Sequence, residues 1–220
     1  MPAQSIGYWA HRLVEAGVRH EAPIKRFGEC ILEFTDPDGM GLALVGVPGL
    51  ENEPAWTTGE VPAEHAIRGF HGVTLMLDSA EPTGAILTDV LGFSKAGQEG
   101  PYVRFKSEGA IGGIVDIREA KGFLPGRMGH GSVHHVAFRA KDDAEQAEMA
   151  RKLRELHGLH ATEQRDRQYF RSIYFREPGG ILFEIATDPP GFANDEEADA
   201  LGQKLMLPSW FEGKREEIEK

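Results

Sequence analysis

The segments FREPGGILFEIA (175–186) and FTDPDGMGLALV (34–45) decide the fold of this chain, because they superpose on each other without a gap. Each predicts a strand, a turn made of an acidic residue followed by Pro-x-Gly, and a returning apolar strand. Such self-similarity indicates that one supersecondary unit is used more than once.

A longer plan of strand, helix and further strands surrounds this repeat. In the middle of the chain the pattern predicts a helix over 81–92 and strands over 67–77, 101–107 and 112–120. Toward the C-terminus it predicts a helix over 141–158 and strands over 131–140 and 171–188. Asp142 or Asp143 is a suitable N-cap for this helix, and Gly158 suits the position after its end. The first copy starts at a helix over 5–17, before strands over 28–36 and 41–47, so we expect it to lack its opening strand.

The predicted domain organisation follows these units. The modules are an incomplete αβββ module over 1–50, a βαβββ module over 67–120 and another over 131–190. The remaining segments are a linker over 51–66, a connector over 121–130 and a C-terminal tail over 191–220. Within the tail, the acidic stretch 194–206 predicts a helix.

Composition and charge exclude several classes of protein. The net charge of −11, from 24 basic and 35 acidic side chains, argues against a nucleic-acid binder, which should carry a basic face. No stretch approaches the roughly 18 apolar residues of a membrane span, and the first residues show no secretory signal pattern. Cys30 is the only cysteine, which favours a reducing, cytoplasmic compartment. The expected partner is therefore a small molecule.

His134, His135 and Glu184 are the first candidates for chemistry. Successive strand residues point to opposite faces, so only one of the two histidines can face a given side of the sheet. Glu184 lies in the apolar segment ILFEIA (181–186), where a buried carboxylate is costly unless it is paired or bound to a metal. A histidine and a carboxylate on one face belong to the ligand set of non-haem Fe(II) oxygenases. The alternative is an ordinary His-His strand and a solvent-facing glutamate.

Four strings in order carry a closer resemblance. They are VHHVAFRA (133–140), RDRQYF (165–170), IYFREPGGILFEIATDPPGFA (173–193) and GQKLMLP (202–208). These strings resemble the C-terminal part of hydroquinone ring-cleaving dioxygenases in the vicinal oxygen chelate (glyoxalase) superfamily, and the likeness continues more loosely through WTTGEV (56–61). The resemblance implies an α+β fold of repeated βαβββ modules that form curved mixed sheets.

The same resemblance implies roles for particular residues. His135 and Glu184 correspond to metal ligands of the family, and His134 to a histidine close to the metal site. Tyr174 and Arg167 correspond to residues that line the substrate pocket, where Arg167 would hold a phenolate or an acid product. Their alternatives are a core tyrosine and a solvated arginine.

The implied cofactor is Fe(II), with Mn(II) as an alternative, and the implied partners are a small aromatic substrate and O2. The unpaired sheet edge of an incomplete module favours a homo-oligomer.

The repeat allows an internal check on the ligands. At the place of Glu184 the first unit has Ala43 and the second has Asp116. At the place of His135 the second unit has Gly72. Only the third unit keeps the pair, so we expect the metal site there alone.

A further histidine ligand is missing from this pattern. His71 lies one residue before the matching place, which favours a structural or pocket-edge role. His11 and His20 lie on a predicted helix and in a bend, and neither suits a strand ligand. In the resembling family this histidine comes from an N-terminal module, which the chain is expected to lack.

Two classes of function remain open at this point. The first is the ring-cleaving dioxygenase, only partial in this chain. The second is a non-catalytic protein of the same fold that binds small aromatics, or an inactive fragment. Glyoxalase-type lyase or isomerase chemistry would suit the fold but not the four strings.

Overall fold

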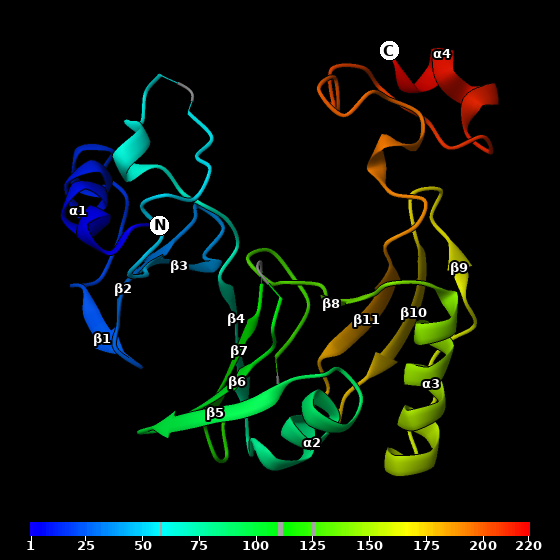
Figure 1. The fold of residues 1–220 in the computed structure, drawn as a ribbon, viewed down its shortest axis with the longest axis horizontal. Coiled ribbons are helices and arrows are strands. Elements are labelled where there is room, and N and C mark those ends of the chain that lie inside the picture. Colours follow the sequence, from blue (N-terminus) through cyan, green and yellow to red (C-terminus); the bar gives the residue numbers. More distant parts are fainter. Residues whose placement is uncertain (58, 110–111, 125) are drawn as a thin grey trace. The chain divides into compact units, whose positions relative to one another are not determined.

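The computed structural model describes residues 1–57, 59–109, 112–124 and 126–220 (Figure 1). Residue 58 of the expected linker and residue 125 of the expected connector lie outside the described residues, as do residues 110 and 111. The chain divides into two compact units, Met1–His134 and His135–Lys220.

The first unit begins with an αβββ module. A short 3-10 turn, η1 (Ala3–Ser5), leads into α1 (Ile6–Glu15). An antiparallel sheet follows in the order β1-β2-β3, formed by β1 (Ile24–Arg26), β2 (Glu29–Thr35) and β3 (Gly41–Gly46). The apolar face of α1 closes a small core over this sheet, made of Met1, Ile6, Leu13 and Leu32.

The rest of the first unit is a complete βαβββ module. Its elements are β4 (Gly72–Leu77), α2 (Glu81–Asp89), β5 (Ser94–Glu99), β6 (Tyr102–Lys106) and β7 (Ile114–Glu119). The sheet order is β4-β7-β6-β5, with β4 parallel to β7 and the other pairs antiparallel. Helix α2 comes close to the sheet at Gly84, where a Cβ atom would overlap the ring of Phe105.

The second unit contains another βαβββ module. Its elements are β8 (Val136–Ala140), α3 (Asp143–His157), β9 (Arg165–Asp166), β10 (Arg171–Arg176) and β11 (Leu182–Thr187). The sheet order is β8-β11-β10-β9, and β8 is parallel to β11, as β4 is to β7 in the first unit.

Both ends of α3 have the chemistry that the sequence predicts. The Asp142 side chain accepts a hydrogen bond from the Glu145 N–H, as an N-cap should. Gly158 ends the helix at a φ of +65°, a conformation that glycine adopts without strain. The helix is fastened to the sheet by buried Gln146, whose amide donates to the carbonyls of Arg171 and Ile185.

Strand register confirms the repeat. The last two strands of every module pair at matching places, through Glu33–Ala43, Arg104–Asp116 and Tyr174–Glu184. The expected α+β fold of repeated βαβββ modules, with an αβββ first module, is therefore confirmed.

The acidic residue of the repeated turn has a structural role. The carboxylates of Asp36 and Glu177 each accept hydrogen bonds from the backbone N–H groups two and four residues later. These bonds satisfy amides that the tight turn leaves without strand partners. The acid-Pro-x-Gly motif is thus explained by turn formation alone.

The end of the predicted linker packs on α1. The Trp9 indole donates to the carbonyl of His65 in η2 (Ala63–His65), and the Tyr8 ring stacks on the His65 ring at 4.2 Å. The Ser5 hydroxyl donates to the carbonyl of Glu64. These bonds order the linker just before β4.

Four features differ from the sequence-based expectations. No expected range covers β1, β5 or β9, because all three are edge strands without an apolar alternation. The helix predicted over 194–206 is wrong, since this stretch forms bends and turns after the 3-10 turn η3 (Phe192–Asn194). Its closely spaced acidic residues repel one another in a helix, and Asp195 instead bonds to Gln168 and Tyr169.

The tail ends in a 3-10 turn, η4 (Glu212–Lys214), and a single helical turn, α4 (Arg215–Ile218). Among the residues that the structure describes, no helix is both long enough and apolar enough to cross a membrane.

Candidate active site

His135 and Glu184 meet on one face of the second unit's sheet. Glu184 on β11 pairs with Ala137 on β8, and His135 lies two residues before Ala137. His135 directly precedes β8, and its spacing from Ala137 continues the alternation of that strand, which would place it on the face of Glu184. The His135 Nε2 atom lies 2.7 Å from the Glu184 Oε2 atom. The pairing predicted from two distant segments is thus present in the structure.

The Glu184 carboxylate has an unsatisfied oxygen. Its side chain is only 4% exposed, whereas that of His135 is 34% exposed. The Oε1 atom is buried and has no hydrogen-bond partner among the described residues. A buried carboxylate oxygen without a partner is costly unless a cation or a donor completes its surroundings. Imidazole nitrogen beside carboxylate oxygen is a donor set that Fe(II) and Mn(II) accept, so these residues fit such an ion.

Tyr174 and Arg167 lie beside this pair. Tyr174 on β10 is the cross-strand partner of Glu184, and its ring meets the His135 ring edge to face at 5.9 Å. The Arg167 guanidinium lies 5.7 Å from the Tyr174 ring centre and 3.4 Å from its hydroxyl, measured from Nη2. Arg167 is exposed, so its donors can reach a bound molecule.

Ser172 joins this group although the sequence reasoning did not include it. It is fully buried, and its hydroxyl lies 3.3 Å from the Tyr174 hydroxyl and 3.4 Å from Arg167 Nε. Its place two residues before Tyr174 on a strand was an available signal, because such residues share a face.

His134 directly precedes His135 in the chain. It is exposed and ends the first compact unit, while the other candidates lie in the second unit. Its role near the metal stays a prediction.

In the first unit, different side chains occupy the positions that correspond to Glu184 and Tyr174. Asp116 and Arg104 occupy the positions of Glu184 and Tyr174, and both are buried. The Arg104 Nε and Nη2 atoms donate to the two carboxylate oxygens of Asp116, each at 2.8 Å. Arg104 Nη1 donates to Glu29 Oε2 at 2.6 Å.

A histidine at the position of His135 would not fit in this unit. The position is held by Gly72, where a Cβ atom would overlap the carbonyl oxygen of Ile114. His71, one residue earlier, instead reaches Glu29 Oε2 with its Nε2 atom at 3.3 Å. It lies one residue before β4, as His134 lies two residues before β8.

Glu29 gives the first unit a pH-dependent contribution to stability. Burial, the largest single influence, raises the pKa of this carboxyl, but hydrogen bonds from His71 and Arg104 bring it below its ordinary value of 4.5. A carboxyl with a lower pKa in the folded state stabilises the fold above its unfolded pKa, and this stabilisation is lost as pH falls through the folded pKa. We expect the difference in unfolding free energy between wild type and Glu29→Gln to shrink below a pH of about 4.5.

Urea unfolding between about pH 7 and pH 3 measures this difference. A difference that stays constant across the range would contradict the expectation.

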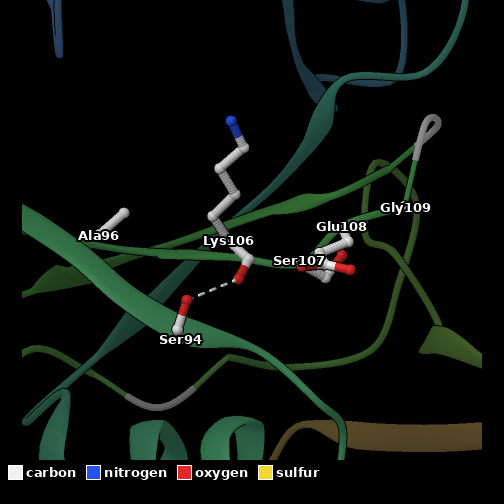
Figure 2. Close-up of a pocket in the computed structure, with 6 residues that line it drawn as sticks. All are labelled: Ser94, Ala96, Lys106, Ser107, Glu108 and Gly109. Carbon is white, nitrogen blue, oxygen red and sulfur yellow. Dashed lines mark hydrogen bonds between the residues drawn. The ribbon is translucent and has the colours of Figure 1, made fainter.

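The surroundings of the site hold no complete metal-ligand set. In the described part of the chain, no group of three or more histidine, cysteine, aspartate or glutamate side chains could hold a metal ion. A hollow of about 510 Å³ lies elsewhere, in the first unit, and Figure 2 shows six of its lining residues. The Lys106 ammonium extends away from the Ser94 hydroxyl, which donates to the carbonyl of Lys106 instead.

Comparison with known proteins decides the family. The model of the Glyoxalase/Bleomycin resistance protein/Dioxygenase superfamily matches residues 62–185. The chain belongs to this superfamily. Its relatives include the Bacillus subtilis protein named "Putative ring-cleaving dioxygenase MhqO", which is 44% identical over all of this chain and 69% of its own length.

Two further comparisons extend the likeness. The chlorohydroquinone/hydroquinone 1,2-dioxygenase of Sphingobium indicum is 30% identical over 99% of this chain and 68% of its own length. A crystal structure of a Bacillus subtilis protein, provisionally described as a dioxygenase, matches with a TM-score of 0.88 and 44% identity. That match covers 99% of this chain and 69% of the other. The resemblance to hydroquinone-type ring-cleaving dioxygenases is therefore confirmed.

Proposed function

We propose that this chain carries the active site of a non-haem Fe(II)-dependent ring-cleaving dioxygenase for hydroquinone-type aromatics. One observation carries the proposal: the adjacent His135 Nε2 and Glu184 Oε2 atoms, with the buried Oε1 atom of Glu184 left without a described partner. A hydroquinone dioxygenase among the relatives supports the substrate class.

In this proposal His135 and Glu184 hold Fe(II), or Mn(II) as the alternative. The bound ion would supply the one-electron chemistry that allows O2 to react with an aromatic ring. A third protein ligand is still required, and we infer that it is a histidine from outside the group of residues named here.

The other residues act on the substrate. Arg167 presents a fixed fork of donors that can pair with a phenolate or with the carboxylate of a ring-opened product. The Tyr174 hydroxyl can donate to or accept from a substrate hydroxyl, and Ser172 and Arg167 restrict its orientation. His134 is proposed to move a proton from a substrate hydroxyl, a role for which histidine is suited near neutral pH.

The test combines metal content with oxygen uptake. After anaerobic incubation with Fe(II) and removal of excess metal, we expect about one iron per chain. We also expect O2 uptake when methylhydroquinone is added, with both atoms of labelled oxygen recovered in a ring-opened product. Iron binding with no O2 uptake on any hydroquinone would overturn the dioxygenase assignment.

A second candidate is a non-catalytic protein that binds small aromatics through the same face. It is favoured by the absence of a third metal ligand among the described residues. In that case the metal-free chain would bind methylhydroquinone in calorimetry, and added Fe(II) would change neither the affinity nor the O2 level.

A further inference from the structure

We propose that Glu29, His71 and Asp116 form a second cation site, in the first unit, whose occupant is the guanidinium of Arg104. When that guanidinium is removed, the site would take a divalent cation such as Mn(II), Co(II) or Zn(II). The inference concerns the first unit alone, and its support from the repeat rests on the proposed function.

Position in the repeat is the first support for this site. Asp116 occupies the place of Glu184, the carboxylate proposed to hold metal in the second unit. Arg104 occupies the place of Tyr174 and is the cross-strand partner of Asp116, as Tyr174 is of Glu184. The guanidinium therefore lies against the carboxylate that corresponds to the metal ligand.

Geometry is the second support. Three nitrogens of Arg104 each contact a carboxylate oxygen within 2.8 Å, two from Asp116 and one from Glu29. His71 Nε2 touches the same Glu29 oxygen at 3.3 Å. The side chains of Arg104 and Asp116 are only 8% and 6% exposed, so water does not compete strongly for these contacts.

The β1–β2 turn closes one side of the cluster. Phe27 adopts a positive φ of 50° there, which is uncommon for an aromatic residue. Its ring lies 4.2 Å from the Arg104 guanidinium, and its N–H donates to Glu99 on β5. The turn thus brings Glu29, the first residue of β2, to the guanidinium.

Charge and ligand type explain why a divalent ion could replace the guanidinium. The two carboxylates carry two negative charges, and Arg104 offsets one of them. A divalent cation would offset both, and carboxylate oxygens with one imidazole nitrogen suit Mn(II), Co(II) and Zn(II). In the wild-type chain Arg104 lies between the carboxylates of Asp116 and Glu29, and the described residues contain no three-ligand group that could hold a metal ion. In wild type, Arg104 would therefore prevent the first unit from competing for metal.

The test uses the full chain with Glu184→Ala, so that the proposed metal site of the second unit does not contribute. We expect Glu184→Ala alone to bind no Mn(II) in equilibrium dialysis, and Glu184→Ala with Arg104→Ala to bind about one Mn(II) per chain. Adding Asp116→Asn to the double variant should weaken this binding at least about tenfold, because a ligand is lost. Guanidinium chloride should compete with Mn(II), whereas the same concentration of NaCl should not.

Arg118→Ala is the matched control for the loss of an arginine. Arg118 lies on β7 two residues after Asp116 but is exposed. Combined with Glu184→Ala, it should bind no Mn(II). A folded Arg104→Ala, Glu184→Ala variant that binds neither Mn(II), Co(II) nor Zn(II) would overturn the proposal, as would equal binding by the Arg118 control.

A second variant covers loss of folding. If the Arg104→Ala, Glu184→Ala chain does not fold, refolding it with Mn(II) should restore the wild-type circular dichroism spectrum. The variant Glu29→Gln, Arg104→Met, Asp116→Asn, which removes all three charges, should fold without metal. If Mn(II) does not restore the fold and the triple variant also fails to fold, the Arg104 side chain is needed for packing rather than as a cation. That result would overturn the proposal.

Discussion

Replacing Asp116 by alanine is expected to lower the free energy of unfolding by about 3–5 kcal/mol, the usual cost of breaking a buried ion pair from one side. The variant removes both acceptors of the bidentate contact and leaves Arg104 Nε and Nη2 buried without them. Glu29 still accepts from Nη1, but one carboxylate cannot reach all three nitrogens. Urea denaturation of wild type and variant at neutral pH measures the difference.

Asp116→Asn is the matched control for this prediction. Asparagine keeps the size of the side chain and one acceptor oxygen but removes the charge. The free energy of unfolding of this variant should therefore lie between those of wild type and Asp116→Ala. An alanine variant with wild-type stability would mean that Arg104 finds solvent or another partner. That outcome would contradict the buried network.

Replacing Glu184 by alanine is expected to abolish metal binding while leaving the metal-free fold unchanged or slightly more stable. The loss in Fe(II) affinity should exceed about 100-fold, because losses of 10–100-fold already follow from changes in residues that only support a ligand. The fold should not suffer, since the substitution removes a buried charge with an unpaired oxygen. Iron content after anaerobic reconstitution and urea denaturation of the metal-free chain measure the two effects.

Glu177→Ala provides the opposite pattern as a control. Glu177 is as buried as Glu184 and lies in the same module, but its carboxylate accepts hydrogen bonds from the backbone amides of Gly179 and Ile181. We expect this variant to lose stability and to keep its iron. If Glu184→Ala unfolds the chain while iron content per folded chain is unchanged, Glu184 is structural and the metal site lies elsewhere.

Much of the fold followed from local patterns. The acid-Pro-x-Gly turns, the caps of α3 and the order of strands and helices depend on residues close together in the chain. The pair of His135 and Glu184 also followed, because matching modules place the first and last strands side by side. Edge strands such as β5 did not, since pairing with β6 rather than an apolar alternation makes them strands.

The two buried carboxylates at matching places separate what the sequence predicts from what only the tertiary structure shows. From the sequence alone, the repeat determined that Asp116 and Glu184 occupy the same position on the last strand of their modules. Only the tertiary structure decided that Asp116 is neutralised by Arg104 and Glu29, while Glu184 keeps an oxygen without a described partner. Glu29 and Arg104 are 75 residues apart, and no local periodicity relates them. The physical reason is that a strand pattern fixes which face a carboxylate occupies, whereas the cation that offsets its charge comes from whichever segment folds against that face.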